Sequence, residues 1–222
     1  MKLVETIKEH ILKLINYTAF GRLITGYYFL NKNHLKKSGW KKSVVIRMPI
    51  DKNGSELPWF TYSCIHFLSP RLNKTLSVFE YGSGNSTIWF SRLTKNVTSV
   101  EHNERWHMHM TEKLQKISNV NYFLKDLPSG RYQKEILNYN QAFNIIVLDG
   151  RERVECSFNV LQALTADGVI IWDNSDRTKY AKGYEFLMSN GFQRIDFFGM
   201  GPISAHSWST SIFYKSKNCL NI

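Results

Sequence analysis

Glycine and acidic residues follow three successive apolar segments in the middle of the chain. After the first segment the sequence runs Glu80-Tyr81-Gly82-Ser83-Gly84-Asn85-Ser86. Glycines at positions 82 and 84 allow a tight turn and a close approach to a ligand, and the helix expected after them presents free N–H groups. The second segment ends in Glu101-His102 and the third in Asp126. A carboxylate at Glu101 is suited to binding the two hydroxyls of a ribose, and Asp126 falls where a base would lie.

Two further acidic segments follow the next two apolar runs. These are Asp149-Gly150-Arg151-Glu152-Arg153 and Asp173-Asn174-Ser175-Asp176-Arg177. Two carboxylates and an amide oxygen, from Asp149, Asp173 and Asn174, are the hard ligands that Mg²⁺ or Ca²⁺ prefers. The alternative is that both aspartates cap loops and pair with nearby arginines.

Arginines and one histidine accompany these acids. Arg151, Arg153 and Arg177 are suited to holding a carboxylate or phosphate of a substrate, because guanidinium matches both in a two-point manner. Salt bridges to Glu152, Glu155 or Asp176 are equally compatible with the sequence. His206 lies in a later loop, where it is either a general base or a surface histidine without a chemical role.

Alternating apolar strands and helices must position these residues. We predict strands at 76–81, 97–100, 120–125, 143–148, 169–172, 192–198 and 207–214, and helices at 86–93, 104–117, 154–164 and 180–189. Such alternation is typical of an α/β, Rossmann-like, doubly wound sheet that is mostly parallel. Only a Gly/Pro loop separates the last two strands, so the final strand of this seven-stranded sheet should be antiparallel.

The N-terminal third differs from the rest in pattern and charge. Residues 1–75 hold 13 Lys and Arg against 4 Asp and Glu, whereas residues 76–222 hold 16 against 14. Val4, Ile7, Ile11 and Leu14 predict an amphipathic helix; residues 21–60 read as irregular, and 59–72 as a helix. We therefore divide the chain into a basic, aromatic, helical extension at 1–70 and a ligand-binding domain at 71–222. We expect the extension to cover the part of the site that binds the acceptor, the substrate that receives a transferred group, with Pro58 and Trp59 near that substrate.

Composition sets broad limits on location and partners. The three cysteines are far apart and form no C-x-x-C pair, which indicates a reducing compartment. The sequence shows no signal-peptide pattern and no transmembrane segment, so we expect a cytoplasmic protein. The basic N-terminus is compatible with peripheral membrane contact, with an anionic partner or with simple solvation, and its helix with an oligomer.

In these motifs the chain resembles the class I S-adenosylmethionine-dependent methyltransferases over roughly residues 75–215. Glu80-x-Gly82-x-Gly84 is similar to their glycine motif, Glu101 to their ribose-binding acid and Asp126 to their adenine-side acid. The resemblance implies S-adenosylmethionine as cofactor, bound by Glu80, Gly82, Ser83, Gly84, Ser86, Glu101, His102, Asp126 and Asp149. An NAD- or sugar-nucleotide-dependent Rossmann enzyme remains an alternative, although Thr87 stands where a dinucleotide fingerprint has its third glycine. A non-catalytic binding module with a basic, anion-binding N-terminus is another.

The reaction-side residues show a partial similarity to cation-dependent O-methyltransferases. There a metal, here implied to be held by Asp149, Asp173 and Asn174, lowers the pKa of the acceptor hydroxyl. Glu152 occupies the position of that family's catalytic lysine. We expect Asp149, Arg151 and His206 to act in catalysis.

Three short segments bear on the acceptor. SGW (38–40), PWFTY (58–62) and FEYGSGNST (79–87) resemble uncharacterised bacterial methyltransferases, some from polysaccharide loci. We therefore expect methyl transfer to a hydroxyl oxygen of a small-molecule or glycan-type acceptor, in polysaccharide biosynthesis. A nucleic-acid acceptor is disfavoured because the signature of amino-group methylation is absent after the fourth strand.

Overall fold

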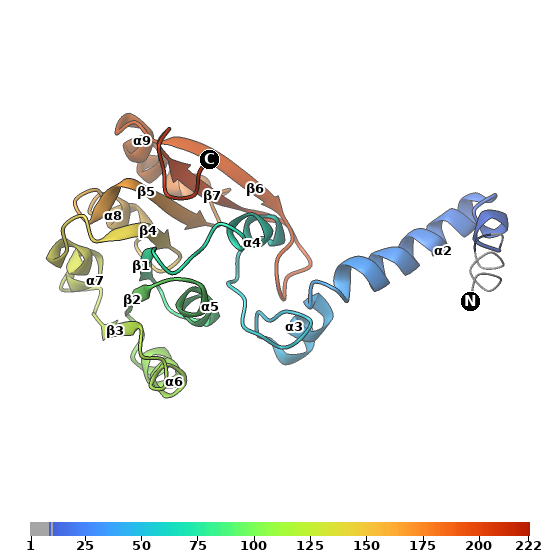
Figure 1. Ribbon diagram of the computed structural model, residues 1–222, viewed down its shortest axis with the longest axis horizontal. Coiled ribbons are helices and arrows are strands. Elements are labelled where there is room, and N and C mark those ends of the chain that lie inside the picture. The colour runs from blue at the N-terminus through green and yellow to red at the C-terminus, as the bar shows by residue number, and fades with distance from the viewer. Residues whose placement is uncertain (1–8, 10) are drawn as a thin grey trace.

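A seven-stranded sheet forms the centre of the molecule. The computed structural model describes Glu9 and residues 11–222 (Figure 1). The strands lie in the order β3-β2-β1-β4-β5-β7-β6. Their bounds are Ser77–Tyr81 (β1), Asn96–Glu101 (β2), Val120–Leu124 (β3), Phe143–Leu148 (β4), Leu164–Asp173 (β5), Gln193–Gly199 (β6) and Trp208–Tyr214 (β7). β1 to β5 pair in parallel, and β7 is antiparallel to both of its neighbours. The predicted fold class is confirmed.

Helices cover both faces of this sheet. They are α4 (Tyr62–Leu68), α5 (Asn85–Leu93), α6 (Glu104–Leu114), α7 (Arg131–Lys134), α8 (Arg153–Ser157) and α9 (Ala181–Ser189), with short 3-10 turns η2 (Glu135–Asn138) and η3 (Thr178–Tyr180). The central strands are buried on both faces, which explains their continuous apolar sequences. Phe79, Ile146 and Trp172 face one core, and Val78, Ile145 and Ile171 face the other.

Two predicted element assignments need correction. The helix predicted at 154–164 ends at Ser157, because Asn159 turns the chain and donates its side-chain amide to Glu155 O at 3.2 Å. β5 then begins at Leu164, five residues before the predicted strand. The polar stretch after β3, for which no element was predicted, contains α7 and η2.

The segment read as irregular at 21–60 is largely helical. It contains most of α2 (Ala19–Phe29), the π-helical turn η1 (Leu30–Leu35) and α3 (Trp40–Ile46). Thr18 begins α2 by accepting a hydrogen bond from Gly21 N at 3.0 Å. Most of the amphipathic helix predicted at 4–14 lies outside the described residues, although residues 11–15 are helical.

The N-terminal segment reaches the domain through α3 and α4, whereas α2 extends away from it (Figure 1). Trp40 Nε1 donates to Ser204 O at 3.0 Å, and Asn85 Nδ2 donates to Pro49 O at 2.7 Å. Phe60, Ile65 and Leu68 are buried in the core on one face of the sheet. Within the described residues, no helix combines the length and apolar character that crossing a membrane requires.

Candidate functional site

The loop after β1 turns sharply because two glycines face each other. Gly82 has φ +89°, and a Cβ there would lie 3.0 Å from Gly150 Cα. A Cβ on Gly150 would lie 1.9 Å from Tyr132 Oη and 2.9 Å from Gly82 N. A Cβ on Gly84 would meet nothing within 4 Å, so the space beside that residue is open. The backbones that follow the carboxyl ends of β1 and β4 are therefore packed against each other. The loop after β1 has open space beside Gly84 in which a ligand can lie.

Glu80 supports this loop from behind. Its carboxylate is buried and accepts hydrogen bonds from Thr87 Oγ1 at 2.5 Å and Ser99 Oγ at 3.2 Å. Thr87 Oγ1 in turn accepts from Gly84 N at 3.1 Å. Burial raises the pKa of Glu80 to about 7, although hydrogen bonds from Ser86, Thr87 and Ser99 oppose that rise. Oε1 of Glu80 has no partner among the described residues.

Glu101 lies at the end of β2 with both carboxylate oxygens fixed. Oε2 accepts from Ser83 N at 3.2 Å and Ser83 Oγ at 3.0 Å, and Oε1 accepts from His102 N at 2.8 Å and Asn103 N at 2.9 Å. Trp106, in the first turn of α6, donates Nε1 to Ser83 O at 2.8 Å. These bonds hold the loop after β1 against the carboxylate that was predicted to bind a ribose.

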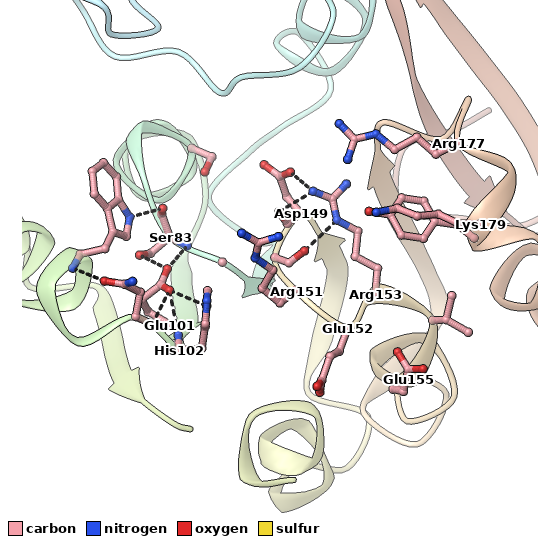
Figure 2. A pocket seen from close by; sticks show the side chains of 17 residues that line it. Ser83, Glu101, His102, Asp149, Arg151, Glu152, Arg153, Glu155, Arg177 and Lys179 are labelled. Carbon is pink, nitrogen blue, oxygen red and sulfur yellow. Dashed lines mark hydrogen bonds and ion pairs between the residues drawn. The ribbon is translucent and has the colours of Figure 1, made fainter. Parts of the chain in front are cut away.

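A cavity of about 690 Å³ opens over these strand ends (Figure 2). Ser83 and Glu101 lie at one side of it, and Arg153, Arg177 and Lys179 at the other. Seven of the predicted site residues line it: Gly82, Ser83, Ser86, Glu101, His102, Asp149 and Arg151. Its volume is within the range of small-molecule and cofactor sites.

Asp126 does not line this cavity. It accepts hydrogen bonds from Ser129 N at 2.9 Å and from Arg131 Nε at 2.9 Å. Hydrogen bonds from Ser129, aided by Arg131, lower the pKa of Asp126 to about 2. Asp126 thus organises the turn that leads into α7.

A second cavity of about 310 Å³ adjoins the first, next to the residues that follow β4 and β5. Its lining comprises Trp59, Asp149, Asp173, Asn174, Arg177, Ser204, His206 and Trp208. The structure thus brings the predicted metal trio and His206 around one space. Asp149 and Arg177 line both cavities. A ligand in the larger cavity and one in the smaller cavity would meet at Asp149.

Asp173 is the most deeply buried acid of the smaller cavity. Its Oδ1 accepts hydrogen bonds from Trp208 Nε1 at 2.9 Å and Thr210 Oγ1 at 2.6 Å. Burial, and then the charge of Asp149, raise the pKa of Asp173 well above its usual range. Burial also raises the pKa of Asp149, although Arg153 opposes that rise. The pair is therefore suited to sharing a proton near neutral pH.

Arg153 lies among the three residues predicted to bind a metal. Its Nη2 donates to Asp149 Oδ1 at 2.9 Å and to Asp149 O at 2.7 Å, and its Nη1 lies 3.4 Å from Asn174 Oδ1 and also donates to Asp173 O. The side chain is 8% exposed. A guanidinium therefore occupies the position that a cation would need, and the trio as folded does not fit Mg²⁺ or Ca²⁺. Among residues 9 and 11–222, no group of three or more His, Cys, Asp or Glu side chains is arranged to hold a metal ion.

Three tryptophans line the two cavities. No function was predicted for Trp106 or Trp208, whereas Trp59 was predicted to lie near the acceptor. Trp106 lines the larger cavity, and Trp59 and Trp208 line the smaller one. The sequence signal that could have identified Trp106 is its place in the first turn of the helix that follows Glu101. Trp208 has no such signal, because β7 reaches Asp173 only through its antiparallel pairing with β5.

The fold is similar to that of several solved structures. No protein-family model and no curated protein sequence matches the chain. Precorrin-6y C5,15-methyltransferase from Geobacter metallireducens matches with a TM-score of 0.54 and 20% identity over 69% of this chain and 88% of that one. The tRNA (m1A58) methyltransferase of Aquifex aeolicus matches with a TM-score of 0.52 and 17% identity over 69% and 67%.

Fibrillarin of Aeropyrum pernix, solved with natively bound S-adenosyl-L-methionine, matches with a TM-score of 0.51 and 14% identity over 64% of this chain and 67% of that one. All three share the Rossmann-like sheet. The chain has the class I methyltransferase fold. At these identities the three methyltransferases share the fold with this chain, and a shared fold does not by itself imply a shared reaction.

Replacing Gly150 by Ala should destabilise the protein by about 1–3 kcal/mol, because its Cβ would overlap Tyr132 and the backbone of Gly82. Gly84→Ala is the matched control: its Cβ enters open space, so the free energy of unfolding should fall by less than about 1 kcal/mol. Urea denaturation measures both. Equal stability of the Gly150→Ala variant and the unchanged protein would contradict the backbone contact.

Proposed function

We propose that this protein transfers the methyl group of S-adenosylmethionine to a hydroxyl oxygen of a small-molecule or glycan-type acceptor. The observation that carries the proposal is the position of Asp149, which lines both the larger and the smaller cavity. The donor would occupy the larger cavity and the acceptor the smaller one. Bound S-adenosylmethionine would supply an electrophilic methyl group on its sulfonium.

The donor side offers hydrogen-bonding groups of the required kinds. The Glu101 carboxylate, held by four donors from Ser83, His102 and Asn103, can accept from both ribose hydroxyls. Gly82 and Ser83 bring backbone close to the ligand, and Trp106 adds an aromatic surface. Asp126 pairs with Arg131 outside the cavity, so its predicted contact with the adenine side stays a prediction.

The acceptor side offers a base. In the transfer, the acceptor O–H bond and the sulfonium–methyl bond would break, the acceptor oxygen would form the new bond to the methyl carbon, and S-adenosylhomocysteine would leave. The proton passes to the Asp173 carboxylate, whose raised pKa makes it a better proton acceptor than an ordinary aspartate. Trp208 and Thr210 hold Oδ1, which leaves Oδ2 for the acceptor. His206 lines the same cavity and can relay that proton to solvent.

Unpaired cations surround the meeting point of the two cavities. Arg151, Arg177 and Lys179 line the larger cavity, and none of them forms an ion pair with a described Asp or Glu. Arg177 also lines the smaller cavity, and a guanidinium there favours an acceptor that carries a carboxylate or a phosphate. Arg151 lines only the larger cavity, so its predicted part in catalysis stays a prediction.

The N-terminal segment contributes one wall of the acceptor cavity through Trp59. Replacing Trp59 by Ala should raise KM for the acceptor by about tenfold, because an aromatic contact of roughly 1 kcal/mol or more is lost. Affinity for S-adenosylmethionine should stay unchanged, since Trp59 does not line the larger cavity. Steady-state kinetics with each substrate varied separately measures this. An unchanged acceptor KM would contradict the proposal that residues 1–70 cover the acceptor side.

Incubation with labelled S-adenosylmethionine and a panel of neutral, carboxylated and phosphorylated sugars tests the proposed reaction. Mass spectrometry should detect a methyl ether on an anionic member of the panel, and excess chelator should leave its yield unchanged, because Arg153 occupies the position of a metal. Methylation of an amine or a carbon atom instead of oxygen would overturn the proposed acceptor class. Loss of activity in chelator would restore a metal role.

A further inference from the structure

Helix α2 presents an apolar face that nothing in the described chain covers. Phe20, Leu23, Ile24 and Tyr27 follow the spacing of one helix face, and Phe20 and Leu23 are 72% and 71% exposed. Beside this face, Gly21 is packed against the preceding turn, where a Cβ on it would lie 1.6 Å from Ile15 O. Leu14 and Tyr17 in that turn are exposed as well. Among the described residues, this end of the N-terminal segment is therefore apolar and uncovered.

The domain does not lie beside α2. α2 extends away from the sheet and its helices, so no element of the domain covers it (Figure 1). Solvent-exposed apolar faces of this length are unfavourable in water and mark a surface that binds a partner.

Positive charge accompanies the apolar face. Residues 11–47 contain eight Lys and Arg and no Asp or Glu. The side chains of Arg22, Lys32, Lys36 and Lys37 are exposed on α2, η1 and the turn that follows. A second copy of this segment would bring two sets of like charges together, whereas an anionic surface would attract both.

We infer that α2 and η1 form a docking surface for an anionic lipid membrane, with α2 lying in the plane of the interface. The apolar side chains of Phe20, Leu23, Ile24 and Tyr27 would enter the boundary between headgroups and acyl chains, and the lysines and Arg22 would contact anionic headgroups. Tyrosine and phenylalanine suit this depth because they combine an apolar ring with tolerance of the interface. The inference is independent of the proposed reaction.

Co-sedimentation of the full-length protein with vesicles tests this inference. The protein should bind vesicles of phosphatidylglycerol mixed with phosphatidylcholine, bind pure phosphatidylcholine much more weakly, and dissociate as salt is raised. Leu23→Glu should weaken binding to the mixed vesicles by at least about 10-fold, and Lys36→Glu with Lys37→Glu should do the same. All three positions are exposed, so neither variant should disturb the fold.

Met188→Glu is the matched control for Leu23→Glu. Met188 is 47% exposed on α9, in the domain, and its replacement introduces the same charge. Vesicle binding that Met188→Glu and Leu23→Glu weaken equally would overturn the inference. So would equal binding to neutral and anionic vesicles, or light scattering that shows a dimer which Leu23→Glu converts to monomers.

Discussion

Replacing Asp173 by Asn should lower kcat for methyl transfer by about 100- to 10,000-fold, the range that a positioned general base contributes. The amide oxygen of Asn can still accept the hydrogen bonds from Trp208 and Thr210, so the side chain should keep its position. An amide cannot take the acceptor proton. Affinity for S-adenosylmethionine should stay within about twofold, because Asp173 lines the smaller cavity and not the larger one.

The dependence of rate on pH distinguishes this role from a structural one. Burial and Asp149 raise the pKa of Asp173, so the ionised base is lost as pH falls through that raised value, well above the ordinary pKa of an aspartate. The rate of the unchanged enzyme should fall on that acidic side, and the residual rate of Asp173→Asn should not. Asp176→Asn is the control, since Asp176 lies in the same loop and lines neither cavity. Full activity of Asp173→Asn would assign the proton transfer to His206 or to solvent.

Replacing Glu101 by Gln should weaken binding of S-adenosylmethionine by roughly 10- to 150-fold, because two charge-assisted hydrogen bonds to the ribose are worth about 1.5–3 kcal/mol together. Gln keeps the size of the side chain and one oxygen that can accept from Ser83 or from His102 and Asn103. Calorimetric titration of both proteins measures the difference.

Glu104→Gln provides the control for this change. Glu104 begins α6, three residues after Glu101, and its exposed side chain does not line the cavity. Its replacement removes the same charge from nearly the same place, so a general electrostatic effect would weaken both variants alike. If the two variants bind S-adenosylmethionine equally well, Glu101 does not contact the ribose.

The sheet and its ligand-binding edge could be predicted because local sequence specifies them. Phe143–Leu148 is a continuous apolar run, which indicates a strand that is buried on both faces. Parallel strands place their carboxyl ends at one edge, so Gly82, Glu101 and Asp149 had to meet there. None of these steps required contacts between distant residues.

The parts that could not be predicted depend on long-range contacts. Arg153 stabilises the reaction side by donating to Asp173 O, 20 residues away, and no local pattern indicates that contact. The antiparallel pairing of β5 with β7 brings Trp208 to Asp173 across 35 residues. The helical state of α2 was missed because its glycines and aromatic residues resemble a loop, whereas a single cap at Thr18 begins the helix.

Calorimetric titration of the full-length protein with S-adenosylmethionine, S-adenosylhomocysteine and NAD tests the donor site directly. We expect both adenosyl compounds to bind with one site per chain and NAD not to bind, because the loop from Gly82 to Thr87 lacks the third glycine of a dinucleotide site. Binding of NAD, with no measurable binding of either adenosyl compound, would contradict the assignment of the 690 Å³ cavity to a methyl donor.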